Sequence, residues 1–314
     1  MPKLKIHRFA VAAAAGLLLL GCSASDASDA DSEEVQGDVV VVTTNFTESK
    51  IMASMYQQVL RASGVDAGIK ELTSREVIIP ALSKGEVQIS PDYLSSFTEF
   101  LNKQENGSDA TEVASANVEK TFTEAKRLAE PAKLTVLPPA EAQDQNAFAV
   151  TQEFAAENNL KTLSQLGEYS QASPITLGAG PECPERPFCL PGLEEVYDVQ
   201  IEKFVPLDSG GPLTVQGLKQ GLINVGVVFS SSGSISAQNL AVLADDKKLQ
   251  VAENLIPVVY TPAVTPTVTK ALNSVSAVLT TKELQQLNEA VDIERKQPEQ
   301  VATEFLESKG LLPK

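Results

Sequence analysis

Histidine and tryptophan are nearly missing from this 314-residue sequence, which contains one histidine and no tryptophan. The histidine, His7, lies in an N-terminal segment that we expect to be removed, so the mature chain would have no imidazole. An imidazole is the usual base of a serine nucleophile and a common ligand of zinc. The sequence therefore argues against both chemistries, and we expect neither a metal nor a cofactor.

One short stretch looks like an exception. Residues 208–214 read DSGGPLT, which is similar to the nucleophile segment of trypsin-like serine proteases. That serine needs a histidine to accept its proton. Because the mature chain offers none, the protease interpretation fails on chemistry.

Basic residues are also scarce. The sequence has 25 Lys and Arg against 41 Asp and Glu, a formal net charge of -16. Removal of residues 1–21, which contain Lys3, Lys5 and Arg8, would leave 22 basic residues and a net charge of -19. Such acidity excludes the electrostatic basis of nucleic-acid binding. We expect a monomer whose partner is a small molecule.

Long apolar runs are absent after the N-terminus. Phe9 to Leu20 form an apolar run behind three basic residues, too short to span a membrane but typical of a signal peptide. The run ends at Gly21-Cys22, which resembles the lipobox of bacterial lipoproteins. We therefore expect a lipoprotein signal peptide at 1–21, lipidation of Cys22 by diacylglycerol and palmitate, and a disordered acidic tether at 22–37. An ordinary cleaved signal with an incidental cysteine is the alternative.

From residue 39 the pattern alternates between strands and helices. VVVVTT predicts a buried strand, and the spacing of Met52, Met55, Tyr56 and Val59 predicts an amphipathic helix ending near Gly64. GIKELT and VQIS predict further strands, and a similar alternation resumes after NAFAVT. This order predicts an α/β protein with parallel strands and right-handed crossovers.

The length and pattern suit two α/β lobes. We expect lobe 1 to comprise 38–140 and 255–314, and lobe 2 to comprise 141–254, with the C-terminal helices packed on lobe 1. Ligands of open α/β sheets bind beyond the carboxyl ends of the strands. Attention therefore falls on TTNF, SPDY, FSSS and the residues around NAF.

These stretches carry a family resemblance. TTNFTESKIMASMYQQVL, SREVIIPALSKGEVQISPDYLSSF, GLINVGVVFSSSG and LAVLADDKK together resemble the substrate-binding proteins of osmoprotectant ABC importers, the glycine betaine, choline and quaternary-amine group. The resemblance implies a two-lobed periplasmic-binding-protein fold of type II with a ligand cleft between the lobes. It also implies a lipoprotein on the extracytoplasmic face of a bacterial membrane, which hands its solute to an ABC permease.

In that family a cage of tyrosines holds the ammonium head by cation–π attraction, and a basic side chain binds the carboxylate. The first tyrosine of the family cage falls on Tyr93, and the hydroxyl residue three positions later falls on Ser96. A second cage position falls on Phe229, a conservative replacement.

Three further positions differ from the family pattern. Asn146 and Glu253 stand where the family has tyrosines, and Thr44 stands where it has a basic residue. The carboxylate-binding arginine of the family is kept as Arg186. The resemblance thus implies a solute-binding site at these positions. The lost aromatic faces favour a small polar solute, zwitterionic or hydroxylated, over choline, and they predict that glycine betaine binds weakly or not at all.

Two cysteines flank Arg186 in PECPERPFCLPG, residues 181–192. The C-x5-C spacing does not match a C-x-x-C redox motif, and two cysteines without histidine make a poor metal site. In an exported protein a Cys183–Cys189 disulfide is the simplest reading. We interpret it as a staple that presents Arg186 to the ligand.

Two other functions remain open from the sequence. A two-lobed clamp also serves ligand sensors and surface-interaction modules. An extracellular enzyme would need a carboxylate base, for which Asp92, Asp144, Asp208 and Glu253 are the candidates. No nucleophile–base pair accompanies them, so we expect that the protein is not an enzyme.

Overall fold

The computed structural model describes residues 39–208 and 210–313 of the chain. The expected signal peptide, Cys22 and the tether at 22–37 lie outside the described residues. Among the residues that are described, no helix combines the length and apolarity needed to cross a membrane.

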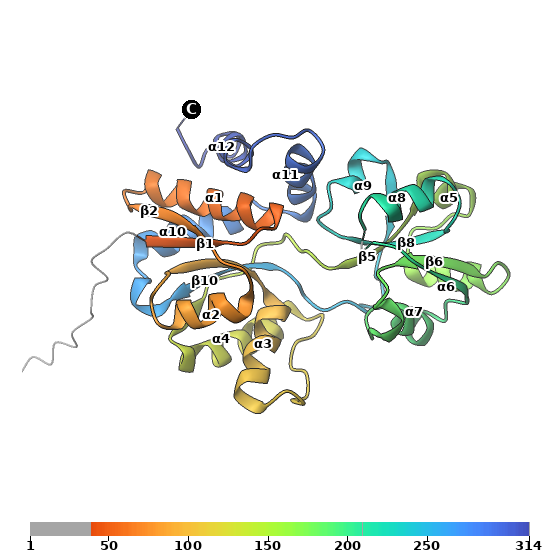
Figure 1. Ribbon diagram of the computed structural model, residues 1–314, viewed down its shortest axis with the longest axis horizontal. Helices are drawn as coiled ribbons and strands as arrows, with labels where there is room; N and C mark the ends of the chain where they lie inside the picture. Colours follow the sequence, from red (N-terminus) through yellow and green to blue (C-terminus); the bar gives the residue numbers. More distant parts are fainter. Residues whose placement is uncertain (1–38, 209, 314) are drawn as a thin grey trace, which may run out of the picture. The chain divides into compact units, whose positions relative to one another are not determined.

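The first of two five-stranded sheets has the strand order β2-β1-β3-β10-β4 (Figure 1). Its strands are β1 (Val39–Thr43), β2 (Ala67–Glu71), β3 (Ile89–Tyr93), β4 (Leu134–Val136) and β10 (Leu255–Tyr260). The helices of this part are α1 (Thr47–Ala62), α2 (Arg75–Ser83), α3 (Leu94–Asn106), α4 (Val118–Ala129), α10 (Pro266–Ser276), α11 (Thr281–Asp292) and α12 (Pro298–Ser308), with the 3-10 turns η1 (Glu130–Ala132) and η3 (Thr261–Ala263).

The second sheet has the strand order β7-β6-β8-β5-β9. Its strands are β5 (Asn146–Thr151), β6 (Ile175–Ala179), β7 (Ile201–Pro206), β8 (Val225–Phe229) and β9 (Leu240–Leu243). The helices of this part are α5 (Gln152–Glu157), α6 (Leu163–Ser170), α7 (Leu190–Tyr197), α8 (Pro212–Lys219) and α9 (Ser234–Ala237), with the 3-10 turn η2 (Cys183–Glu185). Two such sheets confirm the predicted α/β class.

Each sheet is covered on both faces. In the first sheet, α1 and α10 lie on one side and α2 and α3 on the other (Figure 1). Successive residues of β1 point to opposite faces, so Val41 packs into the core beneath α1 and α10, whereas Val42 packs into the core beneath α2 and α3. Both valines are at most 1% exposed. This two-sided burial explains why β1 reads as a continuous apolar run rather than an alternating one.

The sheets are mixed rather than purely parallel, which corrects the expectation from the sequence. β1 runs parallel to β2 and β3, and β6 runs parallel to β7 and β8. However, β10 is antiparallel to β3 and β4, and β5 is antiparallel to β8 and β9. β5 and β10 are the strands at which the chain enters a sheet after leaving the other one. They therefore do not belong to a local β-α-β unit with a parallel crossover.

The two passages between the sheets run side by side. Asp144 N donates to Glu253 O at 3.0 Å, and Leu255 N donates to Ala142 O at 3.0 Å. The passages comprise 137–145, between β4 and β5, and 244–254, between β9 and β10. These hydrogen bonds pair the two passages with each other just before β5 and β10 begin, so the connection between the sheets is two-stranded.

β3 extends further toward the C-terminus than the sequence predicts. The pattern predicts a strand at VQIS, with SPDY at its carboxyl end, but β3 covers ISPDY. Antiparallel pairing of Tyr93 with Leu255 and of Asp92 with Ile256 extends it. The sequence prediction also omitted β4, β7, β10, α4, α5, α7 and α9. Of these, α4 is a 12-residue amphipathic helix, so its pattern was detectable.

Candidate functional site

A cavity of about 530 Å³ contains six of the seven predicted ligand residues. These six are Tyr93, Ser96, Asn146, Arg186, Phe229 and Glu253. They come from the last residues of β3 and β8, the first residue of β5, the start of α3, the cysteine segment and the passage before β10. The seventh, Thr44, lines a smaller neighbouring cavity of about 160 Å³. Tyr93 borders both cavities.

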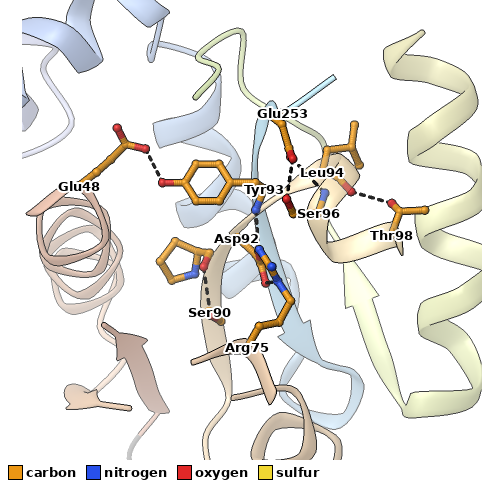
Figure 2. Close-up of polar contacts among 10 residues, drawn as sticks. Glu48, Arg75, Ser90, Asp92, Tyr93, Leu94, Ser96, Thr98 and Glu253 are labelled. Carbon is orange, nitrogen blue, oxygen red and sulfur yellow. Dashed lines mark hydrogen bonds and ion pairs between the residues drawn. The ribbon is translucent and has the colours of Figure 1, made fainter. Parts of the chain in front are cut away.

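Tyr93 is held by hydrogen bonds from both its side chain and its backbone. Its hydroxyl donates a hydrogen bond to Glu48 Oε1 at 2.6 Å, and its backbone N–H donates to Asp92 Oδ1 at 2.7 Å. Figure 2 shows both contacts. Burial, reinforced by the negative charge of Glu48, raises the pKa of Tyr93 well above 10, so the phenol stays neutral. The ring is thus held in place without a charge of its own.

Arg75 secures this arrangement from α2. Its guanidinium lies 2.5 Å from Asp92 Oδ1, and its Nε lies 3.2 Å from each oxygen of that carboxylate (Figure 2). Asp92 is only 6% exposed, so the pair is largely withdrawn from solvent. Since Asp92 also accepts from the Tyr93 backbone N–H, this carboxylate links Arg75 of α2 to the last residue of β3.

Glu48 connects Tyr93 with distant parts of the chain. It is fully buried, and Asn288 Nδ2 of α11 donates to its Oε2 at 2.8 Å. Asn288 Nδ2 also donates to the carbonyl of Ser231 at 2.9 Å, and the Ser231 hydroxyl donates to Asp144 Oδ1 at 2.7 Å. Burial, followed by the charge of Asp144, raises the pKa of Glu48 from 4.5 to about 7. Burial likewise raises the pKa of Asp144.

Glu253 has a structural partner at the start of α3. It accepts hydrogen bonds from Ser96 N at 3.1 Å and from Ser96 Oγ at 2.5 Å (Figure 2). A carboxylate at this position suits the positive end of the helix dipole. Burial nevertheless raises the pKa of Glu253, because Ser96 offsets only part of its desolvation.

Asn146 and Phe229 are neighbours across two strands. They pair directly in the antiparallel register of β5 and β8. Phe229 is 39% exposed, which is unusual for a phenylalanine that ends an otherwise buried strand. Both residues line the large cavity. The exposed ring therefore faces space that a ligand can fill.

Arg186 lies in the segment closed by two cysteines. The Cα atoms of Cys183 and Cys189 are 5.3 Å apart, within the usual range for a disulfide, and their side chains are joined. Arg186 follows η2 and is exposed, and its neighbour Phe188 is half-buried. Both contribute to the lining of the large cavity.

The protease-like stretch has a structural use. Asp208 accepts from the backbone N–H groups of Leu213 and Thr214, each at 2.9 Å, and from the Thr214 hydroxyl at 2.8 Å. These donors belong to the first turn of α8. Asp208 therefore serves as a capping carboxylate, and the backbone hydrogen bonds lower its pKa against the opposing effect of partial burial.

The four carboxylates considered as enzymatic bases all have protein donors. Asp92 binds Arg75, Asp208 binds the start of α8, Asp144 accepts from Ser231 and Glu253 accepts from Ser96. Within the described ranges, no group of three or more His, Cys, Asp or Glu residues is placed to hold a metal ion.

Sequence reasoning missed Glu48, Arg75, Asn288 and Phe188. Glu48 and Asn288 are 240 positions apart, and a single sequence contains no signal that joins them. Arg75 is the first residue of α2, where the sequence alone reads it as an ordinary surface residue. Phe188 had a detectable signal, because it stands two residues from Arg186 inside the same cysteine ring.

A family profile described as the substrate binding domain of ABC-type glycine betaine transport systems matches residues 37–308. The glycine betaine-binding protein YehZ of Escherichia coli K12 is 30% identical over 274 residues, which cover 84% of this chain and 88% of that protein. The solved structure of apo YehZ has a TM-score of 0.76 at 28% identity, covering 88% of this chain and 99% of that one.

A solved structure described as a glycine betaine/carnitine/choline ABC transporter has a TM-score of 0.78 at 23% identity, covering 87% of this chain and 99% of that one. At this identity the likeness concerns the fold alone. Together the structural likenesses confirm the predicted two-lobed periplasmic-binding-protein fold.

Proposed function

Since this chain belongs to the substrate-binding proteins of ABC-type glycine betaine transport systems, we propose that its large cavity captures a small zwitterionic or hydroxylated solute. Solute capture for an ABC importer is the function of the family, which is a transport family rather than an enzyme family. Glycine betaine is the reference solute of that class. The comparisons support neither the sensing alternative nor the enzymatic one.

The observation that carries the proposal is the chemistry gathered around the large cavity. Tyr93 and Phe229 provide aromatic faces, which attract an ammonium head. Arg186 provides a guanidinium, which suits a carboxylate. Asp144 and Glu253 add carboxyl groups to the same lining, and these suit a cationic head. A zwitterion with a cationic head and a carboxylate satisfies both kinds of group.

The position and attachment of the protein are further parts of the proposal. Cys22 would carry the lipid, 22–37 would form the tether, and the folded part would work as a monomer on the extracytoplasmic face of the membrane. The lobes would comprise 38–140 with 255–314, and 141–254. This division is supported by the two sheets, which draw on the same parts of the chain. We further propose that the Cys183–Cys189 bridge is present in the exported protein, because that compartment favours disulfides.

Calorimetry on the purified protein with glycine betaine, choline and a polyol tests the ligand class. Because a relative that is 30% identical is a glycine betaine-binding protein, we expect glycine betaine to be preferred over choline despite the lost aromatic faces. Arg186→Ala removes the guanidinium offered to the carboxylate, and Glu253→Gln removes a carboxylate offered to the cationic head, so each should weaken binding about tenfold. Arg127→Ala is the matched control, since Arg127 is exposed on α4 and pairs only with Glu105 and Glu124 among the contacts described.

Choline binding that is tighter than glycine betaine binding and survives both substitutions would contradict the proposed ligand class. Delivery is tested separately by solute uptake in cells that lack the protein and are complemented with each variant. Uptake that does not depend on the protein, despite binding in calorimetry, would argue against delivery to a permease.

A further inference from the structure

We propose that Phe188 is a specificity-determining residue of the solute cavity, where its ring completes an aromatic enclosure with Tyr93 and Phe229. This inference rests on the proposed function and identifies which residues recognise the ammonium head. The three rings come from separate parts of the chain: the end of β3, the end of β8 and the cysteine segment.

The position of Phe188 matters because other cage positions lack aromatic side chains. Asn146 and Glu253 occupy two sites at which the family resemblance implies tyrosine, and neither offers a π-face. All three phenyl or phenol rings line the same cavity as these two residues. Phe188 therefore supplies an aromatic face from a different segment of the chain.

The ring has a packed side and an open side. Phe188 packs against the core cluster that contains Cys183, Cys189, Leu193 and Leu249. It is only half-buried, however, and it is among the residues that line the cavity. An aromatic ring held in this way can meet a ligand without first losing much side-chain freedom.

The backbone around Phe188 is also fixed. Arg186 N donates to Cys183 O at 3.2 Å, and Cys189 N donates to Arg186 O at 3.0 Å, so the cysteine ring contains two tight turns. Gln250 Nε2 donates to the carbonyl of Phe188 itself at 2.9 Å. Gln250 is 6% exposed, which protects this contact from competition with water.

Gln250 is positioned in turn by Asp245. The Asp245 carboxylate accepts from the N–H groups of Leu249 and Gln250, each at 2.8 Å, and from the hydroxyl of Tyr197. This loop therefore holds one side of the Phe188 backbone while the disulfide holds the other. Asp245 and Gln250 are positioning residues that act through Phe188.

The test compares glycine betaine with 3,3-dimethylbutanoate, which has the same shape and carboxylate but a neutral carbon in place of the ammonium nitrogen. Phe188→Leu keeps an apolar side chain on the core and removes the π-face. We expect it to weaken glycine betaine binding by about 2- to 30-fold and to leave the neutral analogue nearly unchanged. Phe154→Leu is the matched control, because Phe154 packs on the same core and its ring meets Tyr169.

A double-mutant cycle tests the role of the cysteine ring. Cys183→Ser with Cys189→Ser should weaken glycine betaine binding in the wild-type background and add little in the Phe188→Leu background. If instead the two effects add, the disulfide acts through another residue such as Arg186, and the positioning part of the inference is overturned.

The outcomes separate the inference from the proposed function. If the wild type binds glycine betaine but Phe188→Leu changes affinity for both compounds equally, Phe188 is only a packing residue and the inference fails alone. Glycine betaine at about 10 mM would nearly saturate even a site with a dissociation constant of about 1 mM. If the wild type shows no binding at that concentration, the proposed ligand class fails and the inference fails with it.

Discussion

Replacement of Glu48 by glutamine should change how the stability of this protein depends on pH. Glu48 is fully buried, and burial together with the nearby charge of Asp144 raises its pKa from 4.5 to about 7. The difference between these two values corresponds to about 3 kcal/mol of free energy. Glutamine has nearly the same shape but cannot ionise, so it imitates the protonated carboxyl at every pH.

The sign of the effect follows from proton binding. Between pH 4.5 and about 7, Glu48 is more protonated in the folded state than in the unfolded state. The free energy of unfolding therefore decreases as the pH rises through this window. The stabilising contribution is complete below pH 4.5 and is lost once the pH passes about 7. The free energy of unfolding of Glu48→Gln minus that of the wild type should therefore increase by up to about 3 kcal/mol as the pH rises from the lower to the upper end of this window.

Urea unfolding followed by circular dichroism measures this difference, since the chain has no tryptophan. Glu195→Gln is the matched control because Glu195 is exposed on α7. Asp144→Asn should move the midpoint of the wild-type pH dependence downward by removing a like charge. If the unfolding free energies of the wild type and of Glu48→Gln differ by the same amount from pH 4.5 to above about 7, the reasoning is refuted.

Three further changes have defined outcomes. Tyr93→Phe removes a hydrogen bond that lowers the pKa of Glu48, so the midpoint of the same pH dependence should rise; an unchanged midpoint would show that the bond is not formed. Asp208→Ala removes the cap of α8 and should lower the free energy of unfolding by about 1 kcal/mol in urea titrations, and no loss would contradict the capping role. Cys22→Ala should shift the protein produced in its natural host from the detergent phase to the aqueous phase, whereas equal partitioning of both forms would exclude a lipid anchor.

The sequence was informative where burial leaves a local pattern. VVVVTT predicted β1 because both faces of that strand are covered, and the spacing of Met52, Met55 and Tyr56 predicted α1 because one face of the helix is buried. Residues at the carboxyl ends of strands, such as Tyr93 and Phe229, were expected near a ligand, and they line one cavity.

The remaining features depend on contacts that no local pattern encodes. The reversed direction of β5 and β10 follows from chain passages between the sheets, so alternation of strands and helices could not predict it. Glu48 reads as a favourable acidic residue in the first turn of α1. Its burial becomes visible only when Asn288, from α11, is placed beside it.

The strand order of the first sheet determines when that sheet can be completed during synthesis. β10 lies between β3 and β4, yet it is made only after all five strands of the second sheet. A growing chain that ends before Leu255 has no partner for β4 and leaves one edge of β3 open. It also lacks α10 and α12, whose apolar residues cover α1. The second sheet, in contrast, uses the continuous stretch 146–243 and has all its strands at that stage. The segment made first is therefore the one that finishes folding last, and fragments that stop before β10 would expose a strand edge prone to association with other chains.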